Sequence, residues 1–188
     1  LGKTLQMVAF TYLYLRNKKG RCVLILAPKS TLLNWQHEFN EKWTRYFERN
    51  VAIPTFLIED HERTKQKRWK KIKKWTRGGV LFLSYEMFRS FVDDNGESED
   101  DGLGDDSIGS LMDEVARRKK QQKAADWHKY HEKFTKALFE KTDLIICDEG
   151  HKIKNPKTKL SQVIVQVQTR DRIVLTGTPL QNHLMEYY

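Results

Sequence analysis

The chain has 188 residues, of which 39% are hydrophobic and 31% charged, and its formal net charge is +9. This length is enough for one domain with a hydrophobic core. No apolar run approaches the roughly 18 residues that indicate a membrane-spanning helix, so we expect no membrane partner. The two cysteines, Cys22 and Cys147, lie in apolar runs without disulfide or zinc spacing. They are typical of small buried side chains in a reducing, intracellular compartment.

The charge is distributed unevenly along the chain. The stretch from Asp93 to Asp106 contains eight acidic residues and no base, which leaves 34 Lys and Arg against 17 Asp and Glu elsewhere. A surface with that balance favours a polyanion such as nucleic acid. The chain starts at Leu1, inside a motif, and we expect it to be a fragment of a longer protein, truncated at both ends.

In chain order, helical and strand patterns alternate. Residues 3–17 repeat apolar side chains at helical spacing, and residues 21–28 (RCVLILAP) predict a strand buried on both faces of a parallel sheet. Ser30 or Thr31 can then cap a helix whose buried stripe is Leu32, Trp35, Phe39 and Trp43. Further strands are predicted at 54–59, 78–86, 143–149 and 171–179, and further helices at 62–77, 112–140 and 158–167. This alternation predicts an α/β fold, a mostly parallel sheet with helices on both faces.

Two stretches carry unusual charge. Residues 92–110 are acidic and rich in Gly and Ser, which predicts a flexible insertion exposed on the surface. The stretch from Asp60 to Arg77 carries nine Lys and Arg, with Trp69, Ile72 and Trp75 on one stripe. It is either a surface that contacts phosphates or an amphipathic helix that docks its tryptophans and exposes a solvated face.

The chain begins with Leu1-Gly2-Lys3-Thr4, which matches the end of a P-loop, G-x-x-x-x-G-K-[ST]. In a P-loop, backbone N–H groups at a helix N-terminus hold phosphates, the lysine reaches the β and γ oxygens, and the hydroxyl binds Mg²⁺. Gly2, Lys3 and Thr4 are therefore candidates to bind ATP, and Thr4 is a candidate Mg²⁺ ligand. A plain glycine-started helix with a solvated lysine explains the same three residues.

The stretch Asp148-Glu149-Gly150-His151 follows an apolar run. Carboxylates at the end of a buried strand are costly to desolvate without a positive partner. In an open α/β sheet, ligands bind beyond the carboxyl ends of the strands. Asp148 is therefore a candidate to hold Mg²⁺ through water, and Glu149 to orient the water that attacks the γ-phosphate. The alternative is an ordinary exposed acidic turn.

The last predicted strand ends in VLTGTPLQN, residues 174–182. Thr176, Gly177 and Thr178 are small residues, and the threonine hydroxyls are candidates to couple His151 to a nucleic-acid path by hydrogen bonds. A plain strand-to-helix turn explains the same residues.

Five stretches, in this order, carry a resemblance to a known family: LGKT, LILAPKSTLLNW, LSYE, CDEGHKIKN and LTGTPLQN. Together they resemble the first ATPase lobe of the Snf2 family, in helicase superfamily 2, over nearly the whole chain. The sequence DEGH, where many relatives have DEAH, and the long insertion before it look most like the ATRX branch of chromatin remodellers. The resemblance implies one RecA-like P-loop NTPase lobe over residues 1–188, with the acidic insertion at 92–110 inside it.

The resemblance also implies a role for each matching position. Catalysis would use Glu149, Lys3, Asp148 and His151, with ATP and Mg²⁺ as cofactors. His151 would link the nucleotide to the coupling residues Thr176, Gly177 and Thr178. Because they match positions of the family, the resemblance also implies that five residues face DNA: Lys29, Ser30, Ser84, Lys154 and Asn155.

The function implied by the resemblance is that of an ATP-dependent double-stranded-DNA translocase that remodels chromatin in the nucleus, with nucleosomes and histones as further partners. The insertion would contact basic histone tails, mask the DNA path, or serve as a spacer without a partner. A second lobe, absent from this chain, would supply arginines worth about 10³–10⁵ in rate, so we expect the isolated chain to be inactive. Two alternatives are a catalytically degenerate lobe kept as a DNA- or histone-binding scaffold, and a P-loop ATPase that does not use nucleic acid.

Overall fold

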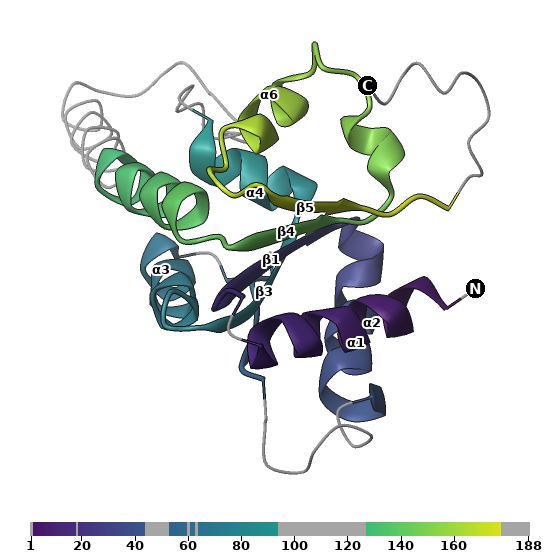
Figure 1. The fold of residues 1–188 in the computed structure, drawn as a ribbon. Helices are drawn as coiled ribbons and strands as arrows, with labels where there is room; N and C mark the ends of the chain where they lie inside the picture. The colour runs from purple at the N-terminus through teal and green to yellow at the C-terminus, as the bar shows by residue number, and fades with distance from the viewer. Residues whose placement is uncertain are drawn as a thin grey trace, which may run out of the picture.

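The computed structural model describes residues 2–17, 19–43, 53–59, 61–62, 64–93 and 127–177. Its centre is a five-stranded, wholly parallel sheet with the strand order β2-β3-β1-β4-β5 (Figure 1). The strands are β1 (Cys22–Ala27), β2 (Thr55–Leu57), β3 (Gly79–Ser84), β4 (Leu144–Cys147) and β5 (Asp171–Val174). All five lie within predicted strands, and the predicted α/β fold is confirmed.

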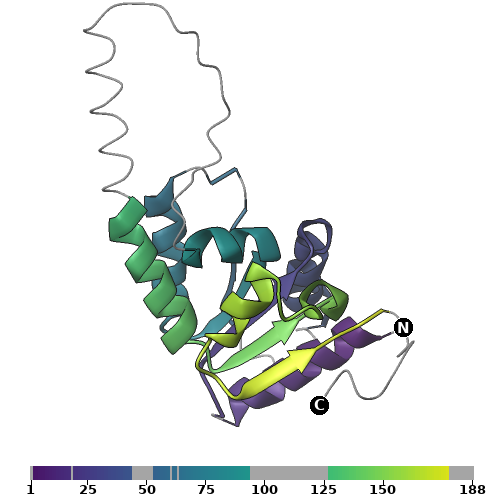
Figure 2. The ribbon, with the colours of Figure 1, turned by 90° about the horizontal axis from the view of Figure 1, so that it is seen from above.

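Helices cover both faces of this sheet (Figures 1 and 2). The side chains of β1 alternate between two hydrophobic clusters, because successive residues of a strand point to opposite faces. One cluster includes α1 (Lys3–Arg16), α2 (Leu32–His37) and the π-helical segment η2 (Glu38–Trp43). The other includes α3 (Lys65–Trp75), α4 (Tyr85–Val92), the helical residues 127–140 and α6 (Lys159–Val165).

The register of the sheet aligns segments that are far apart in sequence. Ala27 pairs with Ser84, Leu26 with Cys147, and Cys147 with Val174. Four strands therefore end at nearly the same level, at the carboxyl edge of the sheet. The residues that follow β1, β3, β4 and β5 all begin at this edge, which is where ligands bind in open α/β sheets.

The region after β3 differs from its prediction. The predicted strand 78–86 ends at Ser84, and the next eight residues form α4. The Ser84 side chain caps this helix by accepting a hydrogen bond from the Met87 backbone N–H, at 3.0 Å. Val92 is the buried last residue of α4, so it cannot belong to a flexible insertion starting at 92. Residues 94–110 of that insertion lie outside the described residues.

The basic helix α3 docks through its apolar stripe. Ile72 and Trp75 are fully buried, and the Trp69 ring contacts Phe134 edge-on with 6.0 Å between ring centroids. The packing interpretation of this stretch is confirmed, while phosphate contact by its exposed lysines stays a prediction. No helix in the described part of the chain is both long and apolar enough to cross a membrane.

Candidate nucleotide site at the carboxyl edge of the sheet

The start of α1 has the backbone of an anion site. Gly2 precedes the helix with φ of 89°, in the left-handed region, and no side chain of the described residues caps the first turn. Among the described residues, a Cβ on Gly2 would meet nothing within 4 Å, so this part of the chain leaves the space beside the turn open. The first N–H groups of a helix have no partner inside the helix, and they attract anions. Lys3 and Thr4 are half-buried in this turn, and Leu1 lies outside the described residues.

Asp148 is held rigidly where β4 ends. Its side chain is buried, and each carboxylate oxygen accepts one hydrogen bond of 2.9 Å: Oδ2 from the Trp35 indole N–H, and Oδ1 from the Glu149 backbone N–H. The Asp148 backbone is fixed as well, because its N–H donates to the Leu26 carbonyl at 2.8 Å. Its own carbonyl accepts from the Tyr85 hydroxyl at 2.5 Å. Trp35, Leu26 and Tyr85, from three other segments of the chain, thus fix the position of Asp148.

Glu149 has a strained backbone. Its φ of 53° and ψ of 58° are left-handed, and no other non-glycine residue in the described segments has positive φ. Such a conformation costs an L-residue about 1–2 kcal/mol, and strain of this kind clusters at functional sites. The Glu149 side chain is one-third exposed, and its Oε2 lies 3.3 Å from Nδ1 of His151. The turn therefore directs a carboxylate toward solvent, next to an imidazole.

Lys3 and Glu149 meet beside Gly177. A Cβ built on Gly177 would lie 3.2 Å from Oε1 of Glu149 and 3.6 Å from Nζ of Lys3. The ammonium group at the start of α1 and the carboxylate after β4 therefore lie on the same side of the molecule, at the end of β5. Thr176 and Gly177 are exposed there, and Thr178 lies outside the described residues.

The backbone at Gly150, next to Glu149, lies very close to the end of β5. It is buried, and its N–H donates to the Leu175 carbonyl at 2.7 Å, while the Leu175 N–H donates to the Cys147 carbonyl at 2.8 Å. A Cβ on Gly150 would lie only 2.2 Å from Cγ1 of Val174. Glycine in the DEGH sequence thus fits the close approach of the turn to β5.

Two ionisable groups beside Asp148 stay neutral. Burial raises the pKa of the Cys147 thiol to about 12, although Arg172 and the Tyr85 hydroxyl oppose this. Burial, and then the neighbouring Cys147 and Asp148 side chains, also raise the pKa of Tyr85. Cys147 therefore packs as a small hydrophobic residue, as predicted, and Tyr85 remains a hydrogen-bond donor.

The predicted DNA-facing residues divide into two groups. Lys29 and Ser30 are exposed in the 3₁₀ turn η1 (Lys29–Thr31) after β1. Lys154 and Asn155 are exposed after the 3₁₀ turn η4 (Gly150–Ile153), where Asn155 Oδ1 accepts from the Lys157 N–H at 2.9 Å. Ser84 is different, because its side chain is 4% exposed and caps α4. The Ser84 side chain is therefore already engaged within the fold, and its place near a DNA-facing side stays a prediction.

The sequence reasoning missed two residues of this edge. Trp35 was expected only as part of a buried stripe. Tyr85 was expected in a strand and, by the family resemblance, near the DNA-facing side, but not as a partner of Asp148. Both are buried and both donate a hydrogen bond to Asp148. The available signal was chemical: a buried indole N–H or phenol hydroxyl needs an acceptor, and the adjacent motifs provide one.

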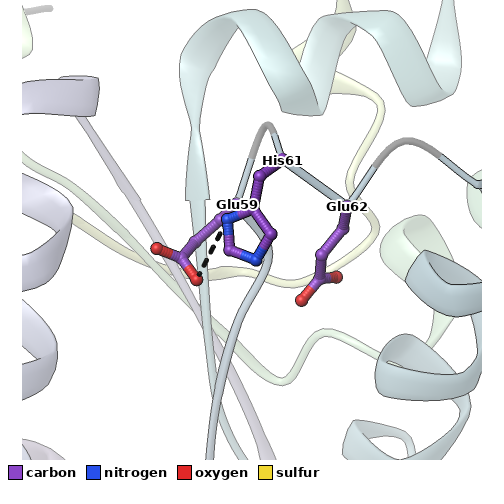
Figure 3. Close-up of side chains that lie close together, drawn as sticks. All are labelled: Glu59, His61 and Glu62. Carbon is purple, nitrogen blue, oxygen red and sulfur yellow. Dashed lines mark ion pairs between the residues drawn. The ribbon is translucent and has the colours of Figure 1, made fainter.

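A second cluster of potential ligands lies between β2 and α3. Figure 3 shows Glu59, His61 and Glu62 close together, with ligand atoms within 4.8 Å of one another. Lys71 already contacts the Glu62 carboxylate and donates to the Leu57 carbonyl at 2.7 Å. The other Glu62 oxygen, Oε2, is buried without a partner among the described residues, and a water molecule would satisfy it at less cost than a dication beside an ammonium. The cluster ties α3 to β2, and we assign it no metal.

The parallel sheet, with the Gly-Lys-Thr helix start and the paired acids at its carboxyl edge, defines a RecA-like α/β lobe. Among solved structures the fold is similar to the "Sulfolobus solfataricus SWI2/SNF2 ATPase core in complex with dsDNA", with a TM-score of 0.56. That match covers 100% of this chain and 28% of the other, and at 19% identity the likeness concerns the fold.

Comparison of sequences identifies the family. Residues 1–188 match the family described as the SNF2-related domain. The "Transcriptional regulator ATRX homolog" of Drosophila melanogaster is 37% identical over 100% of this chain and 12% of its own length. "Helicase ARIP4" of Homo sapiens is 34% identical over 100% of this chain and 13% of its own length. The chain belongs to the Snf2 family, and its predicted likeness to the ATRX branch is confirmed.

Proposed function

We propose that this chain is the first ATPase lobe of a DNA-dependent translocase that remodels chromatin. One observation carries the proposal: Lys3 and the Glu149 carboxylate, which come from opposite ends of the sequence, both lie against Gly177 at the carboxyl edge of the sheet. A lysine that binds phosphate oxygens and a residue that orients the attacking water are two of the groups that P-loop ATPases place around the γ-phosphate.

The residues present fit ATP with Mg²⁺. The described residues leave the first turn of α1 uncapped and open, which suits phosphate oxygens. Each Asp148 oxygen accepts one protein hydrogen bond and keeps lone-pair capacity, which suits a metal that retains several of its waters. Bound Mg²⁺ would neutralise charge on the phosphates. Thr4 and Asp148 would hold it, and Gly2, Lys3 and Thr4 would hold the nucleotide.

The remaining roles concern water and coupling. Glu149 would accept a hydrogen bond from the attacking water and orient it, and His151, 3.3 Å away, would hold the carboxylate in place. Thr176, Gly177 and Thr178 would couple the nucleotide site to the DNA path. Two exposed pairs would contact DNA backbone, Lys29 with Ser30 and Lys154 with Asn155. This arrangement would make turnover depend on bound DNA.

The partners follow from the family and from the part of the relatives that this chain represents. The chain spans about an eighth of the length of the two curated relatives described above. We propose that a second lobe supplies the transition-state arginines, and that duplex DNA is the direct ligand, because the structurally similar ATPase core was solved in complex with dsDNA. Nucleosomes and histones would be the larger target, and the nucleus the compartment, because relatives carry the name of transcriptional regulators.

The test is the ATPase rate of the full-length protein with and without duplex DNA. The proposal expects turnover that rises at least about tenfold with DNA, and negligible turnover by residues 1–188 alone, because an arginine finger is worth about 10³–10⁵ in rate. DNA binding without any turnover in the full-length protein would favour a degenerate scaffold instead. Equal turnover with and without DNA would favour an ATPase that does not use nucleic acid.

A further inference from the structure

Trp35 donates the only side-chain hydrogen bond that the Asp148 carboxylate accepts within the described residues. The indole N–H lies 2.9 Å from Oδ2, and the Trp35 side chain is 2% exposed. Trp35 lies in α2, outside the two segments that carry the proposed nucleotide site, the start of α1 and the end of β4. We propose that Trp35 is a positioning residue, which holds the Asp148 carboxylate in the orientation that binds Mg²⁺. This inference rests on the proposed function.

The charge of the partner makes this contact informative. In the described part of the chain no Lys, Arg or His forms an ion pair with Asp148, and both donors to its carboxylate are neutral. A cationic partner would cancel the charge that a dication needs, whereas a neutral N–H fixes the oxygen and leaves the charge in place. Because the two donors bind different oxygens, they restrict rotation about the carboxylate's own axis. Each oxygen then presents a defined direction to a ligand.

Trp35 is itself held firmly. Leu32 and Phe39, on either side of it along the chain, are 6% and 1% exposed. The Phe39 ring packs against Trp35 with centroids 6.4 Å apart and against Phe82 of β3 at 5.4 Å. The core holds the indole ring in place, and its N–H binds the Asp148 carboxylate. The ring can therefore fix the orientation of that carboxylate. Groups that orient metal ligands in this way are typically worth about 10–100-fold in metal affinity or activity.

Trp75 provides a matched control within the same chain. It is fully buried on the other face of the sheet, and its indole N–H donates to the Val23 carbonyl at 3.1 Å. Replacing either tryptophan by phenylalanine removes one buried N–H donor and part of one ring. Only Trp35 contacts the proposed Mg²⁺ ligand, so a purely structural role predicts the same behaviour for both variants.

The experiment measures the Mg²⁺ concentration that gives half-maximal ATP turnover in the full-length protein, at saturating duplex DNA. For Trp35→Phe we expect this concentration to rise about tenfold, with most of the maximal rate recovered at high Mg²⁺. For Trp75→Phe we expect the wild-type Mg²⁺ dependence, even where the melting temperature falls. Replacing Trp35 by benzothienylalanine, in which sulfur stands in place of the indole N–H, gives the same test with the ring size kept.

A second measurement separates positioning from packing. In Asp148→Asn, the Mg²⁺ dependence of nucleotide binding is already weakened, so adding Trp35→Phe should change it by less than about twofold if Trp35 acts through that carboxylate. Equal shifts in the two tryptophan variants, no shift in either Trp35 variant, or full additivity with Asp148→Asn would each overturn the inference. Those results would leave the proposed function standing. Wild-type protein that binds no Mg²⁺-nucleotide at all would instead refute the proposed function, and the positioning role with it.

Discussion

Two aspartates flank β4, one at each edge of the sheet, and their surroundings differ. Asp143 precedes the strand, and its Oδ2 accepts hydrogen bonds from two backbone N–H groups, of Arg21 at 2.6 Å and Cys22 at 2.9 Å. Its carbonyl accepts from the Tyr14 hydroxyl at 3.1 Å and from Thr169. Asp148 follows the strand and leads into a left-handed glutamate, an imidazole and an open helix start. At the amino edge the Asp143 carboxylate joins chain segments through backbone N–H groups. At the carboxyl edge the buried Asp148 is followed at once by Glu149, whose side chain is one-third exposed.

The comparison shows that strand polarity determines what an acidic residue does in this fold. At the amino edge, the Asp143 carboxylate accepts hydrogen bonds from backbone N–H groups, and these bonds stabilise the fold. At the carboxyl edge, the backbone N–H groups of α1 and the carboxylates remain available to a ligand. Strain is concentrated at the same edge, because Glu149 alone among the described non-glycine residues has positive φ. The variants below test this division, from the largest expected effect to the smallest.

Glu149→Gln should reduce DNA-stimulated turnover by at least about 10²-fold, because an amide cannot accept a proton from the attacking water. Nucleotide affinity, measured by equilibrium binding of a fluorescent ATP analogue, should stay within about threefold of wild type. Glu140→Gln is the control, since that glutamate ends the helix 127–140 near the amino edge. Normal turnover in Glu149→Gln would remove the proposed role of this residue.

Asp143→Ala should lower the free energy of unfolding by about 1–3 kcal/mol, because it leaves two backbone N–H groups without their acceptor. Its nucleotide affinity should not change. Asp148→Asn should show the opposite pattern, with little loss of stability and a strong loss of Mg²⁺-dependent nucleotide binding. Urea unfolding and nucleotide titration of both variants test the division. Similar profiles for the two would contradict it.

Gly150→Ala should cost about 1–3 kcal/mol, because the new methyl group would lie 2.2 Å from Cγ1 of Val174. Val174→Ala in the same protein should recover most of that stability, whereas Val174→Thr, which keeps a branched side chain, should not. A double-mutant cycle of urea midpoints measures the coupling. Additive effects of Gly150→Ala and Val174→Ala would show that this contact does not determine the glycine.

Glu149→Gly should raise the free energy of unfolding by about 0.5–1 kcal/mol, since glycine adopts the left-handed conformation without strain but loses more entropy on folding. The same variant should be inactive. Glu132→Gly, in an ordinary helical position, should instead lose about 1 kcal/mol. A destabilised Glu149→Gly variant would indicate that the glutamate side chain, not the strain, dominates at this turn.

Much of this architecture was predictable from the sequence. The apolar runs at β1, β3 and β4 are buried on both faces of the sheet. In an α/β chain, such runs are typical of central strands of a parallel sheet. The edge that carries Lys3 and Glu149 followed from the rule that ligands bind at the carboxyl ends of parallel strands. Helix α4 was missed because LSYE continues the β3 pattern, and the Ser84 cap that ends the strand is a single hydroxyl.

The contacts to Asp148 could not be predicted from the sequence. Trp35 lies at a helical spacing that packing alone explains, and nothing in that spacing shows where an indole N–H points. Its partner lies 113 positions away in the chain, and the pairing of β1 with β4 brings them together. The burial of the Ser84 hydroxyl was unpredictable for the same reason, because it depends on the helix that follows the strand.

The most direct measurement of the central claim uses an acyl-phosphate derivative of ATP, which transfers its acyl group to a lysine close to the bound phosphates and releases ATP. Mass spectrometry then compares Lys3, at the start of α1, with Lys19, just beyond the other end of that helix. A triphosphate site beside Glu149 predicts that Lys3 is acylated much more than Lys19 and that excess Mg²⁺-ATP protects it. Equal acylation of the two lysines, unaffected by ATP, would contradict such a site.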